Sequence, residues 1–451
     1  MKYYFTLILL IASSATMIAQ EFEGSWYGVL QAGGQRLNLS FHINKNEQGF
    51  TTTMDSPDQN AKGIPVEVTR IEGDRLHLEA PQLALRYSAE IKKDTLFGTF
   101  AQGGFSTTLN LTRTKPAQLR PQEPREPFPY IVKEVSFKNK EGGVRLAGSL
   151  TLPSSKGEFP AVILLSGSGP QDRDESLMGH KPFLVIADFL TRNGIAVLRY
   201  DDRGVGESTG DFSQASLNDL VIDAASALSF LKNHDQVKEI GLVGHSEGGL
   251  VAAMLASGNS NVDFIVSLAG PGVPLDELLI TQNKELSLAL GFTEEQVQPR
   301  LEFNQKMFDL IKSISDEEAL NQAVNDFFNE EEINSAQKRN ELKQQFLSPG
   351  IRSLIKTNPA LYWSKIEVPI LALNGALDLQ VNAKDNLQAI QNANSKGGSA
   401  NVVVKNYPDL NHLFQKAKTG LPAEYGQIEQ TIAPIVLQDI LDFINRNIKR
   451  E

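Results

Sequence analysis

The chain has 451 residues, more than one ordinary domain needs, and 41% of them are hydrophobic, which is enough for sizeable cores. Its net charge of −11 excludes an extended positive surface for nucleic acid or anionic lipid. The absence of cysteine excludes disulfides, thiolate metal ligands and cysteine nucleophiles.

The first twenty residues have the pattern of an export signal. Lys2 supplies a positive charge, residues 3–11 form a short apolar run, and small residues follow it. A run of this length is too short to span a bilayer, and no later segment is long enough either. We therefore expect residues 1–20 to be a signal peptide and the mature protein to be periplasmic or extracellular, without a stable membrane span. The alternative is a buried first strand.

Residues 21–113 are expected to form a small all-β accessory domain. Hydrophobic and polar side chains alternate between residues 37 and 43, which is strand periodicity. Gly33-Gly34 and Gly73-Asp74 mark hairpin turns between such segments. About eight short strands joined by tight turns predict an antiparallel barrel or a small sandwich.

Residues 114–129 contain five prolines, which is typical of an extended, semi-rigid linker. Beyond it, residues 130–451 alternate short apolar runs with helical periodicity, and this predicts an α/β domain with a mostly parallel sheet flanked by helices. The runs predicted as strands are residues 161–165, 195–198, 240–243, 264–268, 370–373 and 402–404. Residues from about 274 to 364 have helical sequence only. We expect them to form an inserted helical cap; the alternative is a set of packing helices remote from the site.

Ser246 lies in the G-x-S-x-G motif Gly244-His245-Ser246-Glu247-Gly248. The motif is short, and a second copy surrounds Ser208, so the context has to decide between them. A nucleophile elbow needs a strand that runs into the motif and a helix that leaves it. Ser246 has both, whereas Ser208 stands in a polar loop. We therefore expect Ser246 to be the nucleophile.

A serine hydroxyl needs a base to take its proton, and histidine is the usual one. On an α/β sheet with a nucleophile elbow, the chain order is serine, acid, histidine. Asp378 follows the predicted strand at 370–373, and His412 follows the last strand, so these two complete the expected triad. Asp378 would fix the tautomer of His412. The other acids considered were Asp385, in a predicted helix, and Asp409, outside the expected loop. The histidines excluded by position are His42, His77, His180, His234 and His245.

Acyl transfer also needs backbone N–H donors for the developing oxyanion. One expected donor is the N–H of Glu247, directly after the nucleophile. The other is expected from the loop at residues 166–170, with Ser168 as first choice and Gly169 as second, because small residues let backbone approach a substrate. The alternative for this loop is an ordinary strand-to-helix turn.

The segments GSGPQDRDE, YDDRGVGES, GHSEGG, NGALD and NHLF resemble those of bacterial α/β-hydrolases of the esterase and serine-aminopeptidase-like group. The resemblance covers residues from about 130 to 449. It implies an α/β-hydrolase fold, hydrolysis of carboxylic esters or, in some relatives, of peptides, and no metal or organic cofactor. The β-rich part resembles an accessory domain that precedes such hydrolases in exported proteins. The loop at 166–170 lacks the HGGG form of lipase-type enzymes.

The leading hypothesis is a serine carboxylesterase that cleaves small, short-acyl esters through an acyl-enzyme. The second hypothesis is an aminopeptidase-like enzyme, for which Glu247 or the cap glutamates would have to bind the substrate's ammonium group. The third is a non-catalytic binding protein on a hydrolase scaffold. It is disfavoured because nucleophile, acid and base all occur in order. The sequence indicates no particular oligomeric state.

Overall fold

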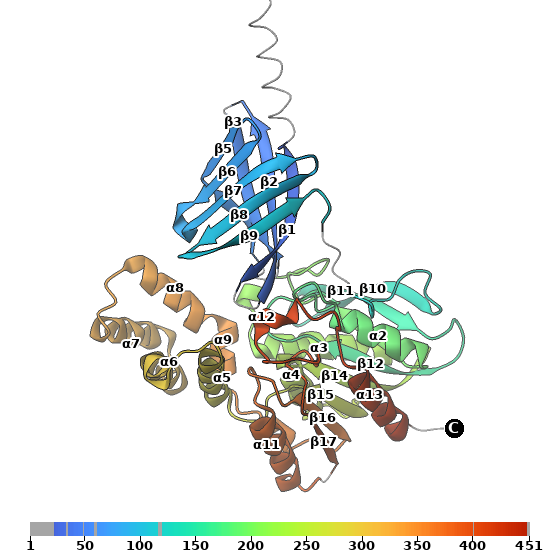
Figure 1. Ribbon diagram of the computed structural model, residues 1–451. Helices are drawn as coiled ribbons and strands as arrows, with labels where there is room; N and C mark the ends of the chain where they lie inside the picture. The colour runs from blue at the N-terminus through green and yellow to red at the C-terminus, as the bar shows by residue number, and fades with distance from the viewer. Residues whose placement is uncertain are drawn as a thin grey trace, which may run out of the picture. The chain divides into compact units, whose positions relative to one another are not determined.

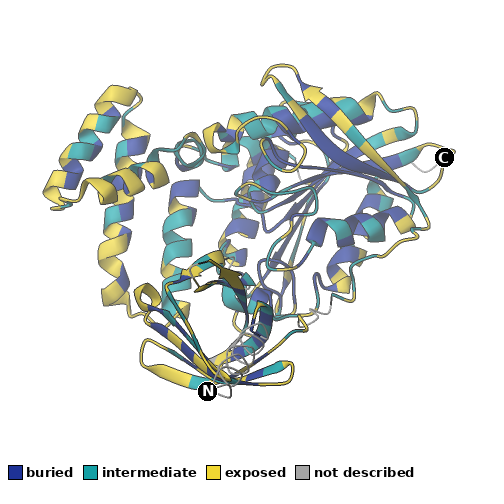
Figure 2. Cartoon of the chain, turned by 90° about the horizontal axis from the view of Figure 1, so that it is seen from above, coloured by how far each residue is buried: buried dark blue, intermediate teal, exposed yellow. Residues whose placement is uncertain are grey.

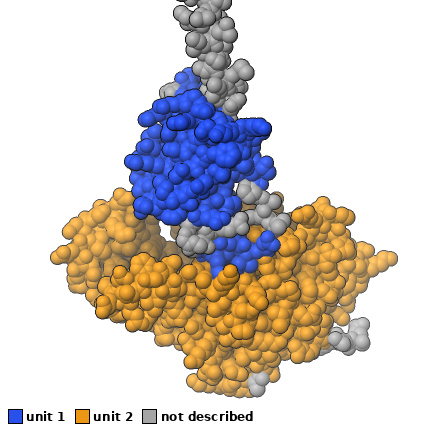
Figure 3. Space-filling model, viewed as in Figure 1, with its two compact units in different colours: residues 1–119, 423–429 blue, residues 120–422, 430–451 orange. Residues whose placement is uncertain are grey.

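The structure is a computed structural model that describes residues 22–32, 35–47, 49–57, 61–115, 120–399 and 401–448. The predicted signal segment and the Gly33-Gly34 turn lie outside these residues. By their internal contacts the residues divide into two compact units, 1–119 with 423–429 and 120–422 with 430–451 (Figure 3).

The first unit is built on an antiparallel sheet of nine strands in the order β4-β3-β2-β1-β9-β8-β7-β6-β5 (Figure 1). The strands are β1 (Gly24–Ala32), β2 (Gln35–Asn46), β3 (Gly49–Ser56), β4 (Ala61–Val66), β5 (Val68–Glu72), β6 (Arg75–Ala80), β7 (Leu85–Lys92), β8 (Thr95–Gln102) and β9 (Phe105–Thr112). A hydrogen bond of 2.9 Å from Thr69 Oγ1 to Thr52 Oγ1 joins β5 to β3. The sheet is therefore nearly closed, as the predicted barrel requires. Its nine strands are close to the eight or so that the sequence predicts.

Large side chains fill the inside of this barrel-like sheet. Trp26, Phe41 and Tyr87 are fully buried. The rings of Phe41 and Tyr87 stack with their centroids 5.4 Å apart, and the Tyr87 hydroxyl donates to the backbone oxygen of Leu109 at 3.0 Å. Alternating inward side chains thus form a packed core in this unit.

The second unit contains an eight-stranded sheet in the order β10-β11-β13-β12-β14-β15-β16-β17. Its strands are β10 (Ile131–Asn139), β11 (Val144–Leu152), β12 (Phe159–Leu165), β13 (Ala196–Tyr200), β14 (Val237–His245), β15 (Phe264–Leu268), β16 (Ile370–Gly375) and β17 (Val402–Tyr407). The pairs formed among β12 to β17 are parallel, whereas β10 and β11 form an antiparallel hairpin at one edge. The six apolar runs of the sequence are the parallel strands.

Helices cover both faces of this sheet, and the strands between them are buried (Figure 2). They are α2 (Pro182–Arg192) and α13 (Pro434–Asn447) on one face, and α3 (Leu217–Lys232), α4 (Glu247–Ala256) and α11 (Ala383–Lys396) on the other. Along β12, Ile163 packs with α3 and α4, while Val162 and Leu164 pack with α2 and α13. Burial on both faces explains why β12 is apolar throughout.

The segment between β15 and β16 is helical, as predicted for the inserted cap. Its helices are α5 (Leu275–Ala289), α6 (Glu294–Ser313), α7 (Glu317–Glu330), α8 (Ala336–Leu347), α9 (Pro349–Ile355) and α10 (Ala360–Trp363). They have a core of their own that includes Met307, Val324 and Phe328. Thr293 and Gln296 start α6 with a capping box, which satisfies backbone donors at the helix end. No helix in the described part of the chain is long and apolar enough to cross a membrane.

Candidate active site

Ser246 stands at the sharp turn between β14 and α4. Its φ of 52° and ψ of −120° are rare for a residue with a side chain and cost about 1–3 kcal/mol. Its N–H donates to the backbone oxygen of Leu268 at 2.8 Å, which ties the turn to the end of β15. A Cβ atom on Gly244 would lie 2.1 Å from the backbone oxygen of Gly248, so this turn needs glycine. Ser246 thus has the geometry of a nucleophile elbow.

Asp378 and His412 come together in loops at the carboxyl ends of β16 and β17. His412 Nδ1 lies 2.8 Å from Asp378 Oδ2, and both side chains are buried. The other carboxylate oxygen, Oδ1, accepts the N–H groups of Gln380 at 2.8 Å and Val381 at 2.9 Å. The carboxylate is therefore fixed at both oxygens, and it orients the imidazole through Nδ1, leaving Nε2 for a substrate-side role.

The loop that carries His412 is shaped by the residue before it. The Asn411 side chain is fully buried, and its Oδ1 accepts the N–H groups of Leu413 at 3.0 Å and Gln415 at 2.9 Å. The same loop is joined to the acid loop, because the N–H of Leu377 donates to the backbone oxygen of Leu410 at 3.0 Å. The NHLF segment is thus a turn that presents His412.

His412 lies beside the elbow. Its ring centroid is 4.8 Å from that of His245, the residue before Ser246. Within the described residues no hydrogen bond joins the Ser246 hydroxyl to His412; in hydrolase sites such contacts often tighten only when substrate binds. The structure therefore brings the three predicted catalytic residues to one place.

Ser208, in the second copy of the motif, is held in a structural role. Its side chain is buried, and its hydroxyl donates to the backbone oxygen of Asp201 at 2.7 Å and accepts the N–H of Ala147 at 2.9 Å. The bond to Ala147 ties this loop to strand β11, and the bond to Asp201 closes the loop on itself. A hydroxyl committed in this way has no base to activate it.

The loop after β12 lies against the nucleophile. A Cβ atom on Gly167 would lie 3.4 Å from the Cβ of Ser246. The N–H of Gly167 is already bound to Glu175 Oε1 at 2.8 Å. For the N–H groups of Ser168 and Glu247, by contrast, no acceptor is found in the described part of the chain. Both expected oxyanion donors are thus available to a ligand, and the same holds for Gly169.

Asp202 forms hydrogen bonds to residues on both sides of this loop, a role that the sequence did not reveal. Its Oδ1 accepts from the Ser166 hydroxyl at 2.9 Å, and its Oδ2 accepts the N–H of Gln171 at 3.0 Å. Burial, the largest influence, raises the pKa of the Asp202 carboxyl to about 8, although these two hydrogen bonds oppose it. The acidic loops QDRDE and YDDRG were the only sequence signal for such contacts.

A mainly apolar hollow of about 270 Å³ opens beside the expected oxyanion donors. Its lining includes Ser168 and Glu247, Phe212 in the turn before α3, Leu217 and Leu220 in the first turn of α3, and Ile351 and Leu354 of cap helix α9. Burial raises the pKa of the Glu247 carboxyl to about 7. The cap therefore contributes to the wall of a site next to the nucleophile.

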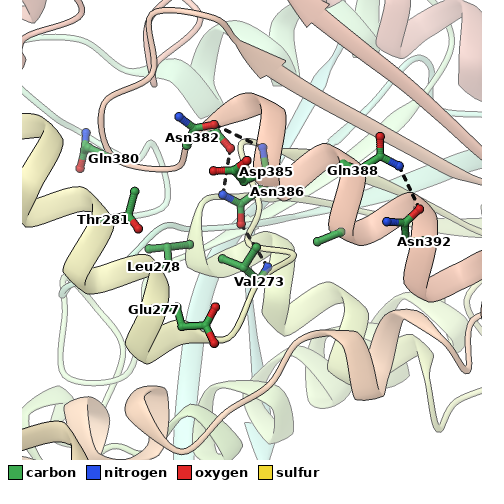
Figure 4. Close-up of a pocket in the computed structure, with 11 residues that line it drawn as sticks. Val273, Glu277, Leu278, Thr281, Gln380, Asn382, Asp385, Asn386, Gln388 and Asn392 are labelled. Atoms are coloured by element: carbon green, nitrogen blue, oxygen red, sulfur yellow. Dashed lines mark hydrogen bonds between the residues drawn. The ribbon is translucent and has the colours of Figure 1, made fainter. Parts of the chain in front are cut away.

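A second hollow, of about 380 Å³, lies between α5 and α11 and has a different character. Figure 4 shows polar side chains around it, among them Glu277 and Thr281 from α5 and Asp385 and Asn386 from α11. None of its lining residues is one of the predicted catalytic residues. The apolar hollow is not lined by these three residues either, but of the two hollows it is the one that contains the expected oxyanion donors Ser168 and Glu247.

No group of three or more histidine and carboxylate side chains in the described ranges is arranged to hold a metal ion.

Comparison with known proteins gives a family and remote structural likenesses. The family described as "Serine aminopeptidase, S33" matches residues 181–416. Esterase EstD of Thermotoga maritima is 30% identical over 311 residues, which are 68% of this chain and 68% of EstD.

Among solved structures, the esterase Pf2001 of Pyrococcus furiosus is 17% identical with a TM-score of 0.45, over 71% of this chain and 92% of that one. Est1E of Butyrivibrio proteoclasticus, solved with ferulic acid, is 13% identical with a TM-score of 0.43, over 69% of this chain and 98% of that one. These structural similarities are too remote to bear on substrate or residue roles.

Proposed function

The chain belongs to the serine aminopeptidase S33 family and is a serine hydrolase of the α/β-hydrolase fold, and we propose that it is an esterase whose catalytic triad is Ser246, His412 and Asp378. The observation that carries the proposal is the strained Ser246 turn beside a buried His412–Asp378 pair. A relative in the same family, EstD, is named an esterase. A serine with a poised base and a fixed acid is the arrangement that acyl transfer requires.

The reaction proceeds in two halves. Ser246 Oγ attacks the ester carbonyl carbon while His412 Nε2 takes its proton, and the N–H groups of Ser168 and Glu247 stabilise the oxyanion. Collapse of the tetrahedral intermediate breaks the ester C–O bond, and His412 protonates the leaving alcohol. Water then attacks the acyl-enzyme by the same route, with His412 as base, and releases the acid and free Ser246.

The apolar hollow supports a short acyl group. At about 270 Å³ it is smaller than the range of roughly 300–1,000 Å³ typical of sites for drug-sized ligands. It begins at the oxyanion donors and ends against Ile351 and Leu354 of α9. An acyl chain bound there would meet the cap after a few carbons.

The peptidase alternative has less support at this site. An aminopeptidase needs a fixed anion for the substrate's ammonium group, and Glu247 is the carboxyl that lines the hollow. Because burial raises its pKa to about 7, Glu247 is partly protonated at neutral pH. An amide also demands closer positioning of a poor leaving group than an ester does.

Two measurements test the proposal. The first compares kcat/KM for acetyl, butyryl and longer acyl esters with that for aminoacyl anilides, and we expect the short esters to be hydrolysed fastest. If anilides are cleaved faster than every ester, the peptidase reading replaces ours. The second treats the protein with an organophosphonate and locates the adduct by mass spectrometry. We expect it on Ser246; an adduct on Ser208 would overturn the assignment.

We also propose that residues 1–20 direct export, as their sequence pattern predicts. Expression in a bacterium should then yield a shortened protein in the periplasm or the medium, with a new N-terminus near residue 20. Recovery of an unprocessed chain from the cytoplasm would contradict this.

A further inference from the structure

A buried ion pair beside the triad has no part in the reaction steps above. His245 Nδ1 lies 2.8 Å from Glu175 Oε1. Glu175 is 3% exposed and His245 is 7% exposed. Burying a carboxylate and an imidazole costs free energy unless their hydrogen bonds are satisfied. The other hydrogen bonds of the two side chains therefore show what the pair holds together.

Each partner also binds backbone of a different catalytic loop. Glu175 Oε1 accepts the N–H of Gly167, next to the expected oxyanion donor, at 2.8 Å. His245 Nε2 lies 3.1 Å from the backbone oxygen of His412. A continuous chain of three hydrogen bonds therefore joins the loop after β12, the nucleophile elbow and the loop after β17.

The acceptors on both sides of His245 define its protonation. A neutral imidazole has one N–H donor, whereas an imidazolium has two. His245 faces a carboxylate oxygen at Nδ1 and a carbonyl oxygen at Nε2, so both nitrogens must carry hydrogen for both bonds to form. Burial lowers the pKa of His245, but the Glu175 charge and these hydrogen bonds outweigh it and raise the pKa overall.

We propose that Glu175 and His245 are positioning residues. They hold the loop after β12, which carries the expected oxyanion donor Ser168, and the catalytic histidine in place relative to Ser246. The inference rests on the proposed function. His245 cannot act as base itself, since neither nitrogen is left to accept a proton. Its role is to fix where the backbone of His412 stands while Asp378 fixes the ring.

The test uses two variants of the full chain. Glu175→Gln keeps an oxygen for the Gly167 N–H but removes the charge that keeps His245 protonated. His245→Gln removes the ion pair but keeps an amide that can donate toward the His412 carbonyl. If the pair positions the loops, kcat falls by up to about 10²-fold in each variant, the effect of misplacing reacting groups by about 1 Å. KM changes little, because ground-state binding is retained.

Asp223→Asn is the matched control. Asp223 is a buried carboxylate bound to Arg203 Nε at 2.7 Å and to Asn139 Nδ2 at 2.6 Å, and neither partner belongs to the three joined loops. It should lower the unfolding temperature and leave kcat near the wild-type value. The double variant Glu175→Gln/His245→Gln should be hardly slower than the slower single variant, because both changes break one chain of bonds.

Organophosphonate labelling distinguishes a failure of the positioning role from a failure of the proposed function. Labelling of wild type at Ser246 with slowed labelling in both variants, at wild-type KM, supports the positioning role. Wild-type labelling at Ser246 with variants that lose only thermal stability, as Asp223→Asn does, overturns the positioning role and leaves the proposed function standing. Failure to label wild type at Ser246 overturns both.

Discussion

The substitution Asp378→Asn tests whether Asp378 is the acid of the triad. The hydrogen bonds of its two carboxylate oxygens determine the expected result. Oδ1 of Asp378 accepts two backbone N–H groups, from Gln380 and Val381. In Asp378→Asn the carboxamide oxygen has to stay at that position, since an NH₂ group cannot accept those bonds. The amide nitrogen then takes the place of Oδ2, 2.8 Å from His412 Nδ1. Because both would be donors, His412 is forced into the tautomer with hydrogen on Nε2.

That tautomer cannot take the proton of Ser246. The loss expected for an acid-to-amide change with intact geometry is about 10⁴-fold in kcat, which corresponds to about 5 kcal/mol of transition-state stabilisation. The fold should survive because the Asn retains the two backbone bonds. The assay is hydrolysis of a p-nitrophenyl short-acyl ester, with circular dichroism to check folding.

Asp409→Asn is the control for this prediction. Asp409 lies three residues before His412, and its half-exposed side chain is 3.2 Å from Lys416 Nζ. An exposed ion pair of this kind contributes little to the stability of the fold. We expect kcat to stay within about twofold of wild type for a substitution of that kind. If Asp378→Asn kept kcat within tenfold of wild type, or Asp409→Asn lost it, the acid assignment would be refuted.

Two further predictions concern stability. The raised pKa of Asp202, about 8, means that the folded state binds a proton that the unfolded state has lost, so this group contributes less stability as pH rises from about 4 to about 8. Asp202→Asn should lack that slope in urea unfolding; parallel pH profiles would contradict this. A fragment starting at residue 118 should be folded and more stable than one starting at 130, because Arg120 Nε donates to Gly179 O at 2.9 Å and Gln122 Nε2 to Ile432 O at 2.7 Å. Equal unfolding temperatures would refute the role of these bonds.

The sheet was predictable where burial leaves a local signature. Strands β12 to β17 are covered on both faces, so each is a short apolar run that can be recognised without partners. The hairpin β10-β11 lies at the sheet edge, and β10 exposes Lys133, Glu134 and Lys138. Because charged and apolar residues are mixed along β10, a search for apolar runs does not find this strand.

The positions of the three proposed triad residues at the ends of strands β14, β16 and β17 could be predicted because each follows a recognisable apolar run. The supporting contacts could not. Glu175 and His245 are 70 residues apart, and the His245–His412 contact spans 167 residues. Which loops meet depends on β12 lying between β13 and β14, and hydrophobic patterns do not encode that order. The sequence of an acid-rich loop therefore shows its charge, but it does not show which side chains the acids will bind.

Carboxyl groups crowd this site, and their arrangement bears on catalysis. Asp378 and Glu175 each form a hydrogen bond to a histidine, and Glu175 faces the protonated His245. Asp202 and Glu247 have no basic partner among their hydrogen bonds in the described chain, and burial raises their pKa values to about 8 and about 7. In the proposed mechanism the transition state places a new negative charge beside the N–H groups of Ser168 and Glu247, where unpaired anions would oppose it. We expect the hydrogen bonds of two acids to histidines, with Asp202 mostly and Glu247 partly protonated at neutral pH, to favour the proposed oxyanion in a protein whose net charge is −11.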